Sequence, residues 1–148
     1  MGRLVTIDGT GTERNRLRRT IAEALRLLGG KQAIDDETRD LAALIVYSLR
    51  HIAQGVDTSA AAWEKRDYYM KADKFRLEWD WVERSAKELE KVLLEGRWND
   101  LPLVLAKLLP RFSDIKLTKM TRTPDLWAGC YDRLLKEDKP KSVVNSRS

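Results

Sequence analysis

Five acidic side chains have the spacing that metal chemistry would need. Carboxylates three positions apart share one face of a helix, and Glu64 and Asp67 have this spacing. Asp36, Glu37 and Asp40 supply a second set. Carboxylate oxygens are the ligands that Mg²⁺ prefers, so a Mg²⁺-dependent nucleotide hydrolase is one hypothesis. Each acid, however, has basic neighbours, and the Asp36–Glu37 pair also suits a helix N-terminus.

The other reactive residue types are scarce. His51 and Cys130 are the only histidine and the only cysteine. This excludes a disulfide within the chain, a zinc site built from several cysteines and a site with two histidine ligands. We interpret His51 as a hydrogen-bonded boundary residue and Cys130 as a small core residue. We therefore predict no catalytic residue, no metal site and no cofactor, and a protein that is not an enzyme.

Basic residues form two clusters that carry the surplus of the net charge of +5. Four arginines occupy the first turns of a predicted helix, where each cation opposes the helix dipole by about 0.3–1 kcal/mol. Arginine suits bidentate contacts to phosphate or carboxylate. We expect the clusters to contact either acidic groups of this fold or of a protein partner, or the phosphates of nucleic acid. Their members are Arg14, Arg16, Arg18, Arg19, Lys116, Lys119 and Arg122.

Aromatic and charged residues alternate in WEKRDYYMKADKFRLEWDW, residues 63–81. On a helix over residues 60–95, apolar positions fall on two nearly opposite stripes. One stripe faces the core and consists of Tyr68, Ala72, Phe75, Trp79, Val82, Ala86, Leu89 and Leu93. The second requires cover from another helix of this chain or from another molecule. It provides the predicted docking residues Trp63, Met70, Leu77 and Trp81.

The elements that must position these residues are helices. Apolar residues recur at helical spacing almost throughout, which predicts an all-α, single-domain bundle of about five helices with one long Trp-rich central helix. The expected helices cover residues 13–29, 36–54, 60–95, 101 to a stop at Pro110, and 124–136. A turn is expected over residues 55–59. We expect an extended arm over residues 1–12, the bundle domain over residues 13–137 and a disordered polar tail over residues 138–148.

Composition limits the setting of this fold. The chain has 148 residues, of which 43% are hydrophobic and 34% charged, and this length suits one domain. No apolar run approaches the roughly 18–20 residues that cross a bilayer. With a single cysteine, we expect a cytoplasmic protein that does not enter a membrane.

Two functional hypotheses of different classes are favoured over the hydrolase. The first is an interaction protein or assembly subunit that forms a homo-oligomer, or docks on a protein partner, through the second apolar stripe. The alternative is a basic helical module that binds nucleic-acid phosphates without strong base specificity, for example as a small subunit of a nucleoprotein complex.

Overall fold

The structure is a computed structural model that describes the backbone of residues 2–147 and the side chains of residues 11–138. Within the described backbone it has five α-helices and no strand, which confirms the all-α single-domain bundle. Three single 3₁₀ turns stand between the helices, at Trp98–Asp100, Leu109–Phe112 and Pro124–Leu126. The α-helices are α1 (Gly2–Gly29), α2 (Asp36–Lys65), α3 (Tyr69–Leu94), α4 (Leu101–Leu108) and α5 (Cys130–Arg147).

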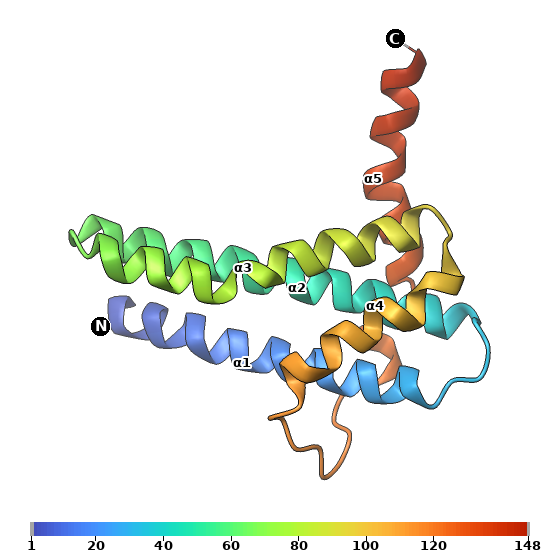
Figure 1. Cartoon of the computed structure of the whole chain (residues 1–148), viewed down its shortest axis with the longest axis horizontal. Helices are drawn as coiled ribbons and strands as arrows, with labels where there is room; N and C mark the ends of the chain where they lie inside the picture. The colour runs from blue at the N-terminus through green and yellow to red at the C-terminus, as the bar shows by residue number, and fades with distance from the viewer. Residues whose placement is uncertain (1, 148) are drawn as a thin grey trace.

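Helix α2 is the centre of the bundle (Figure 1). It packs against α1 and α3, and the N-terminal part of α2 also packs against α5. Helix α4 lies on α3, and the 3₁₀ turn Leu109–Phe112 reaches α1. Each of residues 41–49 is buried, as expected for a helix that is apolar over most of its circumference. Among the described residues, no helix has the length and apolar character that crossing a membrane requires.

The start of α2 is set by the side chain of Asp35. This residue is extended, and its carboxylate accepts hydrogen bonds from the backbone N–H of Thr38 at 2.8 Å and from its hydroxyl at 2.7 Å. The carboxylate thereby satisfies one of the four donors that a helix leaves open at its N-terminus. The hydrogen bond from the Thr38 hydroxyl contributes most to lowering the pKa of Asp35 below its ordinary value. The bonds from the Thr38 backbone N–H and from Lys31 lower this pKa further. Asp36 and Glu37 then follow in the first turn, where acidic residues favour the helix dipole.

The expected turn over residues 55–59 and the single long helix over residues 60–95 are wrong. Helix α2 continues through Gly55 to Lys65, and the chain reverses only at residues 66–68. Val56 and Ala60 are buried four positions apart, so the core face of α2 extends past the glycine. One glycine inside a helix costs about 1 kcal/mol, which the burial of Val56 offsets at about 1.5–3 kcal/mol.

The reversal is a helix C-terminal motif built on an aspartate. Asp67 has a positive φ of 66°. The carbonyl of Trp63 accepts from the N–H of Tyr68 at 2.9 Å, and the carbonyl of Glu64 accepts from the N–H of Asp67 at 3.0 Å. This is the pattern in which a left-handed residue ends a helix, and aspartate tolerates that conformation better than most residues. Gly96, predicted to end the next helix, has a φ of 65° and the same pattern, which confirms that prediction.

The inner stripe predicted for residues 68–93 is largely confirmed. Ala72, Val82, Ala86, Leu89 and Leu93 are buried. Phe75 and Trp79 pack on the core and are half-buried. Tyr68 is exposed because it belongs to the turn rather than to α3.

Both ends of the chain differ from the expected boundaries. Helix α1 begins at Gly2 in place of an extended arm over residues 1–12, and α5 continues to Arg147 through the expected disordered tail over residues 138–148. Extending an existing helix adds one hydrogen bond per residue without a new nucleation cost, which accounts for both extensions. The side chains of residues 1–10 and 139–148 lie outside the described ones.

Replacing Asp67 distinguishes this turn from a continuous helix. Asp67→Gly is expected to leave the free energy of unfolding unchanged or to raise it by up to about 1 kcal/mol, because glycine has no penalty at positive φ. Asp67→Val is expected to lower it by about 1–2 kcal/mol. Urea unfolding measures both changes.

Asp73, exposed within α3, provides the matched control. There Asp→Gly is expected to lower stability by about 0.3 kcal/mol, because glycine is a poorer helix former than aspartate. An equal loss at positions 67 and 73 would mean that residue 67 is helical.

Candidate anion-binding face

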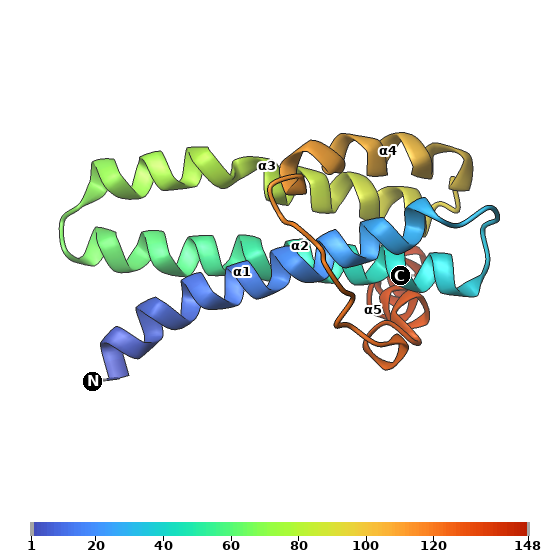
Figure 2. The same cartoon turned by 90° about the horizontal axis from the view of Figure 1, so that it is seen from below.

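An irregular connection over residues 113–123 lies across α1 (Figure 2). Three arginines of α1 hold this connection and the residues just before it. Arg26 donates to the carbonyl of Leu117 at 2.9 Å, and Arg19 donates to that of Lys119 at 2.8 Å. Arg18 donates to the carbonyl of Arg111 at 2.7 Å and so fixes the start of the connection. Backbone carbonyls outside regular structure need donors, and α1 supplies them.

Glu23 of α1 is the acidic centre of this contact. It is 1% exposed, and its carboxylate accepts from the backbone N–H groups of Thr121 and Arg122, both at 2.9 Å. The Thr121 hydroxyl donates at 2.7 Å and Arg19 at 2.8 Å. Burial by itself raises the pKa of Glu23, but the hydrogen bonds from Arg122, Thr121 and Arg19 outweigh it and lower the pKa to about 2.

Arg18 and Arg14 of the predicted cluster point toward aromatic and acidic groups of the fold. Arg18 binds both carboxylate oxygens of Asp114, at 3.1 and 2.7 Å. These hydrogen bonds are the main cause of the lowered pKa of Asp114. The guanidinium of Arg14 lies 5.2 Å from the ring centre of Phe75 and 5.3 Å from that of Trp79, where burial lowers its pKa. Arg14 and Arg18 therefore fasten α1 to its neighbours.

The other predicted basic residues gather where α1 meets the connection. Arg122 donates to the hydroxyl of Thr20 at 3.1 Å and to the carbonyl of Arg16 at 3.0 Å. Arg16 itself is exposed and paired with Glu13. Lys116 and Lys119 are exposed on the connection. Together with Arg26, which was not predicted, these residues form what we call the basic face: Arg16, Arg19, Arg26, Lys116, Lys119 and Arg122.

Sequence reasoning missed Arg26 and Glu23, although a signal for each was present. Arg26 lies seven positions after Arg19, which puts both on one side of α1. Glu23 lies four positions after Arg19, a spacing that favours an ion pair. What no local spacing could show is that Glu23 would bind a segment 98 positions further along the chain.

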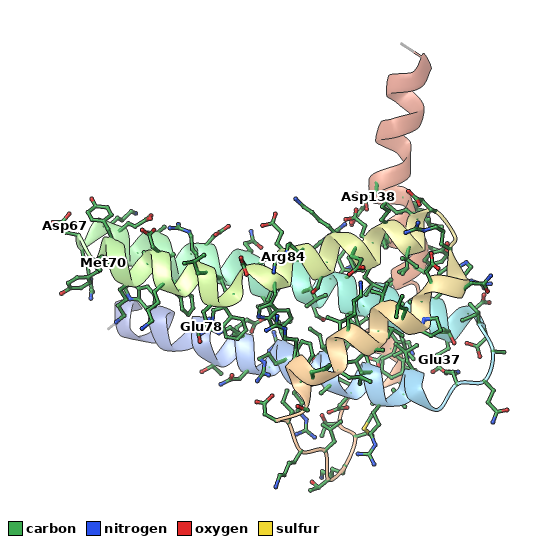
Figure 3. The ribbon with its side chains drawn as sticks, in the orientation of Figure 1. Glu37, Asp67, Met70, Glu78, Arg84 and Asp138 are labelled. Atoms are coloured by element: carbon green, nitrogen blue, oxygen red, sulfur yellow. The ribbon has the colours of Figure 1, made fainter. Side chains whose placement is uncertain are left out.

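The four predicted docking residues are separated by the fold. Trp81 is 8% exposed, because Phe112 packs on it with ring centres 5.8 Å apart. Trp63 is half-buried and contacts the Phe75 ring edge-to-face at 4.9 Å. Met70 and Leu77 are 86% and 72% exposed, and Met70 lies near the end of the α2–α3 hairpin (Figure 3).

The acidic pair considered for Mg²⁺ is also separated. Glu64 is bound by Arg76 at 2.5 Å, and that contact is the main cause of the lowered pKa of Glu64. Asp67 lies in the turn, so the two carboxylates do not share a helix face. Asp40, from the second set, accepts from the backbone N–H groups of Gly129 and Tyr131. The part of the chain with described side chains contains no group of three or more His, Cys, Asp or Glu residues that could hold a metal ion.

Comparisons with protein-family models, with curated proteins and with solved structures gave no match to this chain.

Replacing Glu23 tests its role in holding the connection. Glu23→Gln is expected to lower the free energy of unfolding at pH 7 by about 2–3 kcal/mol, because buried donors lose a charged acceptor. The carboxyl's pKa falls from 4.5 to about 2 on folding. Its contribution is therefore complete above about pH 4.5 and is lost as the pH falls toward 2. Urea unfolding across this pH range should show the two proteins converging.

Glu88→Gln is the control, since Glu88 forms an exposed pair with Lys107 at 2.8 Å. Its expected cost is at most about 1 kcal/mol. A gap between the parent and Glu23→Gln that stays constant from pH 7 to pH 2 would contradict the assigned role.

Proposed function

We propose that this protein binds the phosphate backbone of nucleic acid through the basic face, without strong base specificity. The observation that carries the proposal is the meeting of two basic clusters that are about 90–100 positions apart in the sequence, as the contact of Arg26 with Leu117 illustrates. Residues 13–26 and 111–125 together contain nine basic and four acidic residues. A surplus of positive charge on one surface attracts polyanions and accelerates their association.

The basic face keeps much of its charge despite its contacts within the chain. The contact of Arg26 is to a neutral carbonyl, which leaves its positive charge uncompensated. Among the described residues, no carboxylate lies within salt-bridge distance of Arg26, Lys116 or Lys119. Within the described side chains, Glu13 pairs with Arg16, and the buried Glu23 lies within salt-bridge distance of both Arg19 and Arg122.

Binding of single-stranded RNA and duplex DNA, followed by fluorescence anisotropy across salt concentrations, tests this proposal. We expect log affinity to fall by several units per unit of log salt, because each phosphate contact contributes about 0.7–0.9. Replacing Lys116 and Lys119 together by Gln should lower that slope by about 1.4–1.8.

The matched control replaces Lys87 and Lys91 by Gln. These are two lysines exposed on α3, so the net charge falls equally. Absence of binding at low salt would refute the proposal. An equal loss of slope in both double variants would also refute it, because net charge alone would then govern binding.

A second candidate function, docking on another protein or on a second copy, is favoured by one observation. Met70 and Leu77 remain 86% and 72% exposed, seven positions apart and therefore on one side of α3. Large apolar side chains exposed together commonly belong to interaction surfaces. Trp81 does not belong to this candidate, since Phe112 covers it.

Molar mass in solution tests self-association through this surface. If it operates, light scattering should give a mass above the 17.1 kDa of one chain, and Met70→Glu with Leu77→Glu should restore the monomer because charges oppose apolar burial. Leu103→Glu is the control, as Leu103 is 64% exposed on α4. A monomeric parent protein would remove self-association and leave only a different partner.

A further inference from the structure

A polar cavity of about 770 Å³ opens beside the basic face, between α1, α2 and residues 121–133. It shares Arg16, Thr121 and Arg122 with the α1–connection contact. Arg133 of α5 and His51 of α2 add two further nitrogen groups to its lining. The cavity thus brings together side chains from three separate parts of the fold, and sites for small ligands usually have about this volume.

The arginines of the cavity retain hydrogen-bond donors. A guanidinium has five N–H groups. Within the described residues, Arg16 uses its Nε and Nη2 on Glu13, and Arg122 uses one N–H on each of three neutral oxygens. The carboxylate nearest to Arg133 is that of Glu137, at 3.8 Å. The guanidinium of Arg133 also lies 4.1 Å from the ring centre of Tyr47. Spare donors on three cations that line one cavity suit an oxyanion.

The acidic residues that line the cavity already have partners, and its threonine and tyrosine hydroxyls already donate to oxygens of the fold. Glu13 is paired with Arg16, and Asp125 accepts from the hydroxyl of Thr123. Ser48 lies three positions before His51, so both project from one side of α2.

Apolar side chains form the remaining wall. Leu17 of α1 and Leu44 of α2 are each 8% exposed at its floor, and Leu126 is 45% exposed. A cavity lined by both arginines and leucines suits a ligand that carries a phosphate on a weakly polar group.

We infer that this cavity binds the phosphomonoester of a nucleotide, either at the end of a strand or on a free mononucleotide. The phosphate would lie against Arg16, Arg122 and Arg133, and the base or sugar against the leucines. The inference rests on the proposed function for the strand-end case, because Arg16 and Arg122 belong both to the basic face and to the cavity. For a free mononucleotide it stands without that function.

The experiment uses one internally labelled single-stranded RNA in three forms, with a 5′-phosphate, with a 3′-phosphate or with hydroxyls at both ends. Anisotropy gives the Kd of each form, and calorimetry measures binding of nucleoside monophosphates. We expect one phosphorylated form to bind about tenfold more tightly than the hydroxyl form, a gain of about 1.4 kcal/mol. If the ligand is a free mononucleotide, the monophosphate binds while the three strands bind alike.

Arg133→Gln is expected to remove the tenfold preference or the monophosphate binding. Arg133 is exposed and lies outside the basic face, so the variant should fold, as unchanged thermal unfolding would show. Arg84→Gln, on α3, is the control and should behave as the parent protein.

The outcomes separate the two proposals. Strands that bind alike, in a salt-dependent manner, with no monophosphate binding would overturn the cavity proposal and leave the proposed function intact. Monophosphate binding without any strand binding would do the reverse. A phosphate preference that persists in Arg133→Gln would also overturn the cavity proposal.

Discussion

The carboxylate of Glu23 is the constraint on which the rest of this structure depends. It is a buried charge, and a buried charge is stable only when it is paired and hydrogen-bonded. Its donors come mainly from Thr121 and Arg122, so the connection over residues 113–123 must return to α1. That return places the 3₁₀ turn Leu109–Phe112 against α1 and brings Phe112 onto Trp81. The polar contact of Glu23 with the connection thereby determines that Phe112 covers the apolar side chain of Trp81.

The return of the connection to α1 also determines where positive charge is exposed on the surface of the molecule. Because the connection has no regular structure, its carbonyls take their donors from the arginines of α1. Neutral acceptors leave the positive charge in place, so tying the connection down with arginine also concentrates charge on one side of the molecule. Met70, in contrast, lies near the end of the α2–α3 hairpin (Figure 3), and Leu77 follows it seven positions later on α3. The two candidate functions therefore use different parts of the fold.

The sequence predicted the features that depend on local patterns. Helical periodicity identified the all-α class, and Asp36–Glu37 and Gly96 marked a helix start and a helix end correctly. Prediction from the sequence failed where local signals compete. Gly55 suggested the end of a helix, but the burial of Val56 and Ala60 continues the helix past it. Asp67 adopts a left-handed conformation that is usually assigned to glycine. Prediction also failed where contacts are distant in sequence. The cover of Trp81 by Phe112, and the use of Arg18 on Asp114, follow from packing that no window of residues contains.

This difference governs which residues separate folding from binding. Arg18 and Arg19 each hold the connection and each carry a charge, so a loss of binding on their replacement would not distinguish a lost phosphate contact from a displaced connection. Lys119 takes part in that attachment only through its backbone carbonyl, and Lys116 takes no part in it among the described contacts. The side chains of both lysines are exposed. An effect of these lysines on polyanion affinity is thus a direct electrostatic effect. The arginines that hold the connection also create the positive surface. Replacing the exposed lysines tests whether that surface binds polyanions.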